Sequence, residues 1–337
     1  MDPLTHGLLG AAYGQARHGE TLGRRALVWG AALAMAPDVD IVLSLTGPFA
    51  EWTWHRGVTH ALWFVMLAGA LAGRWLQRSR GGPRRAWIEL AVVAMLTHPL
   101  LDAATTYGTQ LLAPFSNRRF AFDAIAIVDP AYSVALVAGI VGGLRAGVTT
   151  SAARRAGAYA LAVSTLYLGA GLVMNRYTEA SARRQLREQG IVAARVRAYP
   201  TLLQLPYRRI VARSGEDVRV GFVTLLRPRP IQWEAFTQAS GPTVEAARAT
   251  SGVRLFEWFA MGEATPRVVR DGRVERVEFD DLRYGLPGHP RDGLWGVRVA
   301  LDASGRPMGP VERFDRELPE SASKILLTLW RETLGLS

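Results

Sequence analysis

The feature that most constrains the fold is a series of long apolar segments that stops near Asn175. The hydrocarbon core of a bilayer takes a helix of about 20 apolar residues. Runs approaching that length occur before Asn175, whereas charge is spread throughout the rest of the chain. The pattern predicts five full membrane spans and one short or partial one, at residues 3–16, 26–45, 57–76, 86–113, 125–144 and 156–174.

The two unlike halves predict a mainly α fold with two parts. We expect a multispanning helical membrane domain over residues 1–174 and a soluble α+β domain over residues 175–337. Alternating apolar residues on both sides of turn sequences predict hairpins and a mostly antiparallel sheet in the second domain. The expected elements are a polar helix at 178–189, strand pairs at 208–213/218–226 and 266–270/273–279, the second joined through Asp271–Gly272, and a closing helix near 321–334.

The net charge of +11 comes almost entirely from arginine, since Lys324 is the only lysine. In the first half these arginines fall at the ends of apolar segments, where topology and anionic lipid headgroups account for them. We therefore expect membrane lipid as a partner and no nucleic acid. The absence of cysteine from the sequence leaves only nitrogen and oxygen as strong metal ligands.

Arginine placement also orients the spans. Arginine-rich short loops face the cytoplasm in bacterial-type inner membranes. This puts the N-terminus, the 46–56 and 114–124 loops and everything after Asn175 on the outer face of a multi-pass protein. Four tryptophans then fall where interfacial aromatic belts are expected: Trp52, Trp54, Trp75 and Trp87.

A set of histidines and aspartates interrupts the apolar segments, although ionisable groups at membrane depth are costly and mark functional sites. On the expected topology these residues converge on the outer face. Neutral imidazole and carboxylate are ligands that zinc, manganese and iron accept. The set predicts a metal site and consists of His6, Asp38, Asp40, His55, His60, His98 and Asp102.

Local spacing supports one shared site. His98 and Asp102 are four residues apart and project from one face of a helix. Each element also has a simpler explanation, because the His–Asp pair can be a plain hydrogen bond and Asp38 or Asp40 can cap a helix end. His18, in a basic loop, and His289, in a turn, are expected to be solvated.

Several motifs together resemble the YdjM-like family of membrane-bound, metal-dependent hydrolases. The resemblance covers about residues 1–135 and implies a metal-dependent hydrolase in the membrane. It rests on MDPLTHG at 1–7, PDVD at 37–40, HRGVTH at 55–60, HPLLD at 98–102 and PFS at 114–116.

The order of ligands is also distantly similar to that of zinc-dependent phospholipases C and single-strand nucleases. That likeness implies roles for His6, for Asp38 or Asp40, for His55 or His60, and for His98 with Asp102 as a bridging carboxylate. Those enzymes have a second His-x-x-x-carboxylate pair, whereas no histidine lies between His98 and His289 here. One or two ions are therefore expected rather than three.

The chemistry implied is hydrolysis by a metal-activated water. We expect a divalent ion, Zn²⁺ ahead of Mn²⁺ or Fe²⁺, with Asp38 as general base and Arg56 neutralising an anionic oxygen. The order of Asp38 and Asp40, and of His55 and His60, stays open. The expected metal ligands are His6, Asp40, His55, His60, His98 and Asp102.

Three functions follow from these residues. The first is a membrane-bound metal-dependent hydrolase acting on a phosphoester of a lipid or envelope substrate. The second is a proton-coupled transporter with histidines and aspartates as the relay. The third is a non-catalytic membrane scaffold in which the metal is structural and closed by protein ligands.

Overall fold

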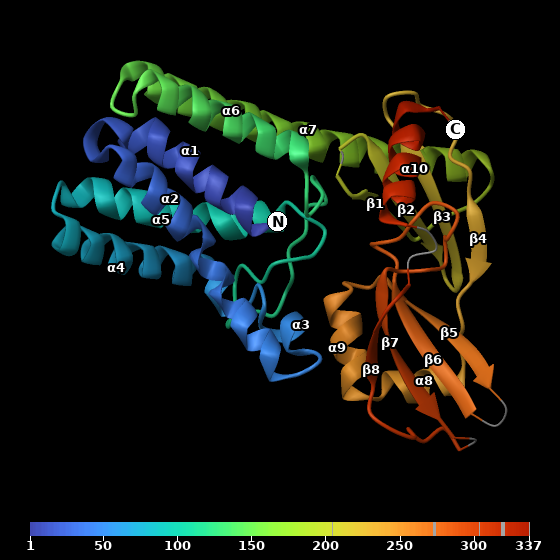
Figure 1. The fold of residues 1–337 in the computed structure, drawn as a ribbon. Helices are drawn as coiled ribbons and strands as arrows, with labels where there is room; N and C mark the ends of the chain where they lie inside the picture. The colour runs from blue at the N-terminus through green and yellow to red at the C-terminus, as the bar shows by residue number, and fades with distance from the viewer. Residues whose placement is uncertain (204, 272–273, 303, 318–320, 337) are drawn as a thin grey trace. The chain divides into compact units, whose positions relative to one another are not determined.

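The computed structural model describes residues 1–203, 205–271, 274–302, 304–317 and 321–336 (Figure 1). Residue contacts divide the chain into two compact units. Unit 1 comprises Met1–Thr46, Trp54–Leu172 and Leu202–Gln204, and unit 2 comprises Gly47–Thr53, Val173–Thr201 and Leu205–Ser337. The chain passes from unit 1 to unit 2 inside one long helix, α7 (Ser151–Glu188).

Unit 1 consists of antiparallel helices. Two aspartate side chains cap helix starts: Asp2 accepts a hydrogen bond from the Thr5 amide at 3.0 Å, and Asp129 accepts one from the Ala131 amide at 3.1 Å. Besides α7, the elements are α1 (Pro3–Leu22), α2 (Arg24–Met35), the 3-10 helices η1 (Ala36–Thr46) and η2 (Val58–His60), α4 (Leu62–Arg80), α5 (Arg84–Ala103) and α6 (Pro130–Ala146).

Among the described residues, three helical stretches are long and apolar enough to cross a bilayer: Arg24–Thr46, Arg84–Ala103 and Ser151–Glu188. Helix α6 is apolar but shorter. The span expected at 86–113 ends earlier, at Ala103. The following residues form a buried irregular segment whose backbone is paired elsewhere, for example between Thr109 and Phe120.

Small residues set the closest approach of helices in unit 1. A Cβ atom on Gly69 of α4 would lie 2.7 Å from the Cα of Val92, and one on Gly73 would lie 2.6 Å from the Cα of Ile88. These distances leave no room for a side chain, so the α4 and α5 backbones meet directly, as helices do in lipid. This contact fixes α5, which carries His98 and Asp102.

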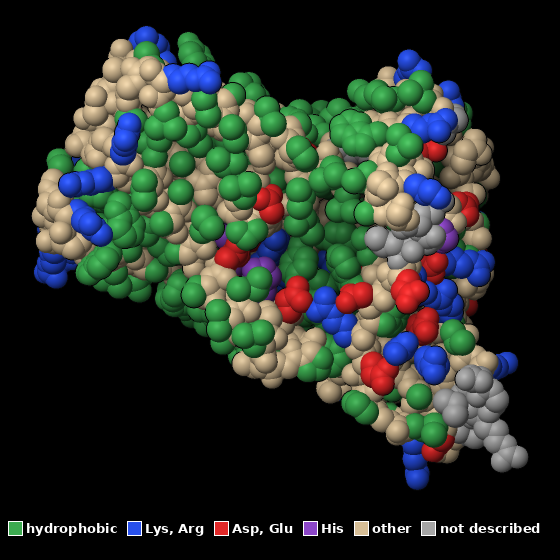
Figure 2. Space-filling view, viewed as in Figure 1, with side chains coloured by type: hydrophobic (Ala, Val, Ile, Leu, Met, Phe, Trp, Pro, Cys, Tyr) green, Lys and Arg blue, Asp and Glu red, His purple; other side chains and the backbone are tan. Residues whose placement is uncertain are grey.

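The loops at one end of unit 1 carry the arginines. The α1–α2, α4–α5 and α6–α7 turns all lie at that end, and Met1, η1 and the C-terminal end of α5 lie at the other (Figure 1). Figure 2 shows basic side chains gathered at the arginine end and a mostly apolar flank between the ends. An apolar flank with charge at one end is the surface expected of a membrane-inserted bundle.

Unit 2 is α+β and contains two antiparallel sheets of four strands each, in the orders β1-β2-β3-β4 and β5-β6-β7-β8. Both expected hairpins are present, with Ser214 paired to Asp217 and Asp271 paired to Val274; the predicted turn residue Gly272 lies outside the described residues. The elements are β1 (Arg195–Pro200), β2 (Tyr207–Ser214), β3 (Asp217–Thr224), β4 (Glu234–Thr237), α8 (Pro242–Arg248), α9 (Ser251–Phe259), β5 (Ala264–Asp271), β6 (Val274–Asp281), β7 (Trp295–Leu301), β8 (Glu312–Asp315) and α10 (Ala322–Leu334).

The sequence predicted this fold class, and the structure confirms it: apolar helices are followed by a region of two antiparallel sheets. The interfacial-belt prediction is wrong for two of the four tryptophans. Trp54 and Trp75 are 54% and 58% exposed, whereas Trp52 and Trp87 are each 1% exposed. Trp87 is buried in unit 1 and donates a hydrogen bond to the Gly81 carbonyl at 2.7 Å.

Trp52 belongs to the short α3 helix (Ala50–Trp54) and is buried in unit 2. Its ring stacks on Phe259 with centroids 5.0 Å apart and lies 5.2 Å from Phe256. The guanidinium of Arg313 lies 4.9 Å from the centroid of the Trp52 ring. An aromatic pocket removes more of the ring from water than an interfacial position does, which explains why the belt prediction fails here.

Arg313 also binds the residue before Trp52, with 2.7 Å between its Nη1 and the Glu51 carboxylate. The segment that links Asp40 to His55 in sequence is therefore held by side chains from α9 and β8 of unit 2. This attachment makes Trp52 a structural residue of the second unit.

We expect Trp52→Ala to lower the stability of unit 2 by about 3–5 kcal/mol, because it empties a buried aromatic site. Trp54→Ala is the matched control two positions away, and its exposed ring predicts a change below about 1 kcal/mol. Thermal unfolding of both purified variants in detergent measures the difference. Equal midpoints for the two variants would contradict the packing described here.

Candidate metal centre

Three stretches of unit 1 bring the candidate residues together. Helix α2 ends at Met35 and continues as the 3-10 helix η1, which carries Asp38 and Asp40. The turn of residues 55–60 carries His55 and His60 and contains Arg56 in the left-handed region with φ 62°. Helix α5 supplies His98 and Asp102 one turn apart. All three stretches lie at the end of the bundle opposite the arginine loops.

Four donor atoms face one another at the centre of this group. The Nε2 atoms of His60 and His98 are 3.0 Å apart. The Asp38 Oδ1 atom lies 3.5 Å from His60 Nε2 and 3.2 Å from His98 Nε2. The Asp102 Oδ2 atom lies 3.3 Å and 3.5 Å from the same two nitrogens. Donor atoms of the four residues all lie within 4.8 Å of one another.

These separations match a tetrahedral site. With zinc–ligand bonds of 2.0–2.1 Å, neighbouring donors in a tetrahedron are about 3.3 Å apart. The five contacts above range from 3.0 to 3.5 Å. The donor set therefore fits a small divalent ion without rearrangement of the backbone.

The outer nitrogens of both histidines are occupied, which directs the inner nitrogens to the centre. His98 Nδ1 is hydrogen-bonded to the carbonyl of Ala34. His60 Nδ1 lies 3.2 Å from Asp40 Oδ2 and 3.0 Å from the Thr59 hydroxyl. A carbonyl or carboxylate on one ring nitrogen places the proton there and leaves the other nitrogen as a metal ligand.

Asp40 holds the turn of residues 55–60. Its Oδ1 accepts a hydrogen bond from His55 Nδ1 at 2.8 Å. Its Oδ2 accepts from the Arg56 amide at 3.2 Å and from the Thr59 hydroxyl. Donors of Asp38, Asp40 and His55 also lie within 4.8 Å of one another, so a second ion position adjoins the first. Asp38 belongs to both groups.

His6 and Arg56 contact the opposite side of Asp102. The Asp102 Oδ1 atom is 3.2 Å from His6 Nε2 and 3.0 Å from Arg56 Nη2, and it also accepts from the terminal amine of Met1. The His6 ring stacks on His98 with centroids 3.6 Å apart. Within the described part of the chain, Asp102 Oδ2 accepts no hydrogen bond and is left for the centre.

Sequence reasoning missed the Met1 amine, the Ala34 carbonyl and the Thr105 hydroxyl, which accepts from Arg56 Nη1 at 3.1 Å. Backbone and terminal atoms carry no residue-type signal. Only Thr105 could have been inferred from its position, since it follows Asp102 by three residues, about one helical turn. Its hydroxyl donates a hydrogen bond to the Asp102 carbonyl at 2.7 Å.

Burial and charge both favour a cation. His60 and His98 are fully buried and Asp102 is 1% exposed, whereas the Asp38 and His55 side chains keep 17% and 14% exposure. The centre opens on the side of Asp38 and His55. The group contains three carboxylates but only two permanent cations, the Arg56 guanidinium and the Met1 amine, so it carries excess negative charge when the imidazoles are neutral. A bound dication compensates that charge.

The two remaining histidines lie outside the centre. His289 is solvated as expected, with a side chain 44% exposed. The prediction for His18 is wrong, because His18 is 4% exposed and packs edge-on against Tyr13 with ring centroids 5.9 Å apart. The helix continues through the expected loop and turns this side chain inward.

Apolar helices, arginine loops at one end and a buried His–Asp centre at the other define a multispanning helical membrane protein with a candidate metal site. The family model that matches is the YdjM inner membrane protein, over residues 1–178. The chain belongs to this family, and the membrane location expected from hydropathy is confirmed.

Two relatives share this region. Inner membrane protein YbcI of Escherichia coli (strain K12) is 34% identical over 124 residues, which are 35% of this chain and 69% of YbcI. Uncharacterized protein YfhP of Bacillus subtilis (strain 168) is 27% identical over 152 residues, which are 42% of this chain and 45% of YfhP. The chain thus matches less than half the length of YfhP. No solved structure matches the chain.

Purified protein should contain about one equivalent of a transition metal, and two at most, because the donors form one complete set and one adjoining set. His98→Asn keeps a donor for the Ala34 carbonyl but removes Nε2, and Asp102→Asn removes one carboxylate charge. Both variants should lose most of the bound metal, as measured by inductively coupled plasma mass spectrometry. His289→Ala and Asp315→Asn, at exposed positions, are the controls and should keep it; wild-type metal content in all four would refute the site.

Proposed function

We propose that this protein is a membrane-bound metal-dependent hydrolase whose centre is formed by Asp38, His60, His98 and Asp102. The observation that carries the proposal is the set of four mutually facing donors at 3.0–3.5 Å, drawn from separate segments. Zn²⁺ is the preferred ion, with Mn²⁺ and Fe²⁺ as alternatives accepted by nitrogen and oxygen donors. When bound, such an ion lowers the pKa of water to about 7 and supplies hydroxide near neutral pH.

The geometry supports moving the ligand role first expected of Asp40 to Asp38. Asp38 Oδ1 faces both imidazoles, which favours Asp38 as a ligand. Both oxygens of Asp40 already accept hydrogen bonds from the 55–60 turn, which favours a positioning role. Asp40 then fixes the tautomer and orientation of His60, a function that metal centres need as much as the ligands.

Asp38 is also the exposed ligand, and this makes it the proton acceptor of the proposed reaction. No hydrogen bond to its Oδ2 occurs within the described residues, so that oxygen is available to a water molecule on the open side. His55 lies on the same side and can receive or return the proton. Water and substrate would enter there.

Arg56 suits a positioning role better than direct binding of an anionic oxygen. One of its terminal nitrogens pairs with Asp102 and the other with Thr105, and the residue is 3% exposed. His6 supports the same carboxylate from the other side. Together these two residues orient Asp102 so that Oδ2 faces the histidines.

The surroundings favour an amphipathic substrate. Helix η1, which carries Asp38, exposes Val39, Ile41, Val42 and Leu45 at 67%, 56%, 60% and 86%. A centre beside exposed apolar side chains is reached most easily by a molecule in the bilayer. We therefore propose a phosphoester of a lipid or envelope molecule as the substrate class, reached from the outer face of the membrane.

A second candidate is a scaffold with a structural ion, since four protein donors can close a tetrahedral site. The partial exposure of Asp38 favours the hydrolase, because that ligand can yield to water. A proton-coupled transporter is disfavoured, because the described candidate residues gather at one end of the helices and a relay needs polar groups across the bilayer.

Asp38→Asn should abolish hydrolysis of each phosphoester in a test panel and should lose most of the bound metal, because it removes both a ligand charge and the proton acceptor. Asp40→Asn should weaken metal affinity by about 10–100-fold through His60 and leave residual activity at saturating metal. Metal titration followed by initial rates separates the two variants, and Asp315→Asn serves as the control. Metal retained in Asp38→Asn and lost in Asp40→Asn would instead support the assignment expected from the sequence, with Asp40 as the ligand and Asp38 as the general base. A metal-loaded wild type without activity towards phosphoesters, carboxylic esters and amides would favour the scaffold.

The topology predicts opposite signals from reporters placed at Gly81, in the arginine-rich α4–α5 turn, and after Ser337. Alkaline phosphatase should be active at the second position and inactive at the first, because arginine loops stay in the cytoplasm. A fluorescent protein that folds only in the cytoplasm should give the reverse result. Cytoplasmic signals at both positions would place the centre on the inner face.

A further inference from the structure

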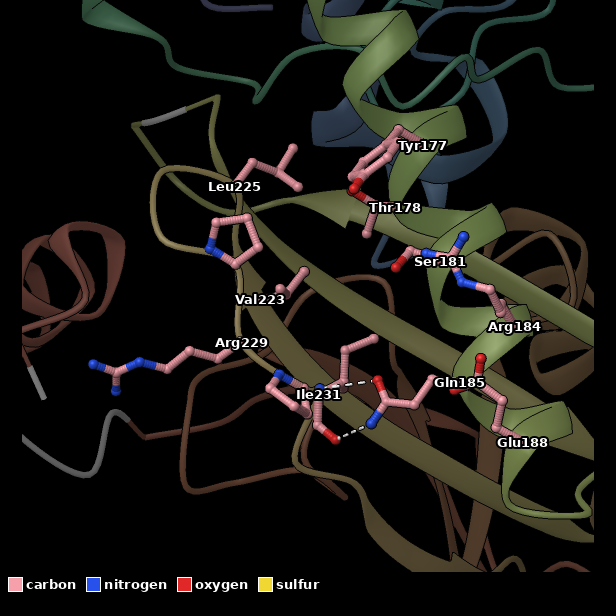
Figure 3. A pocket seen from close by; sticks show the side chains of 12 residues that line it. Tyr177, Thr178, Ser181, Arg184, Gln185, Glu188, Val223, Leu225, Arg229 and Ile231 are labelled. Carbon is pink, nitrogen blue, oxygen red and sulfur yellow. Dashed lines mark hydrogen bonds between the residues drawn. The ribbon is translucent and has the colours of Figure 1, made fainter.

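A cavity of about 350 Å³ lies within unit 2, beside the part of α7 that follows the apolar run. Residues 223–231 form the opposite wall (Figure 3). Its volume is at the lower end of the range for small-molecule sites. Almost all of it lies beyond residue 178, where the family match ends.

The position of this cavity along α7 relates it to the membrane. The exposed aliphatic side chains of α7 end at Val173, which is 69% exposed, and the first cavity residue is Tyr177. At 1.5 Å per residue, Tyr177 lies about 6 Å further along the helix than Val173. The headgroup layer on each side of the hydrocarbon core is about 5–7 Å thick. The cavity therefore begins at headgroup depth, and a tyrosine at that depth is an ordinary interfacial anchor.

The lining combines cations, hydroxyls and an apolar wall. Arg184 projects from α7, and within the described part of the chain it forms no ion pair or hydrogen bond. Arg229 lies on the facing segment, where its side chain points away from α7 (Figure 3) and donates to the Gly335 carbonyl at 3.4 Å. Tyr177 and Ser181 add hydroxyls along α7, opposite Val223, Leu225 and Ile231 (Figure 3). The Thr178 hydroxyl donates to the Met174 carbonyl at 2.8 Å. The lining carboxylate, Glu188, lies at the far end of α7 from the apolar run.

The walls are held together before any ligand arrives. The Gln185 side chain donates to the Ile231 carbonyl at 2.9 Å and accepts from the Ile231 amide at 3.0 Å (Figure 3). Pro228 and Pro230 restrict the backbone on either side of Arg229. A fixed wall lowers the entropy lost on binding.

We propose that this cavity binds the phosphate group of an anionic membrane lipid. Arg184 and the hydroxyls of Tyr177 and Ser181 suit a phosphate, and the Val223–Leu225 wall suits the glycerol and first methylenes of the lipid. Headgroup depth supplies the ligand directly from the bilayer. The proposal does not depend on the metal centre in unit 1.

The test titrates purified full-length protein with dihexanoylphosphatidylglycerol and follows binding by native mass spectrometry. Arg184→Gln should weaken binding about tenfold, the loss expected for one charge-assisted contact, whereas Arg229→Gln should weaken it less, because its side chain points away from α7. Arg187→Gln changes an exposed arginine of the same helix outside the cavity and should weaken binding less than about twofold. Unchanged thermal unfolding midpoints confirm that the variants are folded.

Two further probes identify the source of the phosphate. Dihexanoylphosphatidylcholine, which has no net charge, should bind more weakly than the anionic lipid. Displacement of the lipid by inorganic phosphate at equal concentration would assign the cavity to a free phosphate group and overturn the lipid. Equal loss in Arg187→Gln and Arg184→Gln, or equal binding of both lipids, would overturn the cavity as the site.

Discussion

The burial of Asp102 is the constraint on which the rest of unit 1 depends. A carboxylate that is 1% exposed at the end of an apolar bundle is stable only if several partners compensate its charge. His6, Arg56 and the Met1 amine compensate Oδ1 from three different segments, and Oδ2 faces His60 and His98. Because the buried Asp102 carboxylate requires these partners, the N-terminus and the 55–60 turn both pack against the end of α5. A cation bound at the centre would complete the compensation.

The helices bring these partners together because small residues allow close contact. Gly69 and Gly73 place α4 directly on α5, which holds His98 and Asp102 at the level of the turn that precedes α4. On the other side, His98 reaches the carbonyl of Ala34 where α2 gives way to η1. The change from α to 3-10 geometry after Met35 then directs Asp38 towards the histidines and Asp40 towards the turn. The carboxylate that faces the histidines and the one that holds the turn are thus two positions apart in the sequence.

Unit 2 contributes to this architecture through one short segment. Residues 47–53 leave the helical unit between Asp40 and His55 and are held by Phe256, Phe259 and Arg313. The same unit contains a cavity of about 350 Å³ beside α7, which we propose as a site for a lipid phosphate.

The sequence by itself determined the class of fold, the membrane location and the residue types of the centre. Apolar segment length, arginine loops and hairpin turns are local properties, and they are preserved whatever the packing. His98 and Asp102 were predictable as partners because four residues are one turn of helix. Only the tertiary structure decided that Asp38 faces the histidines while Asp40 holds a turn, that the span expected to end at residue 113 stops at Ala103, and that Trp52 is buried. These outcomes depend on which hydrogen-bonding atoms and aromatic surfaces of distant segments come within reach, and a linear pattern of residue types does not contain those distances.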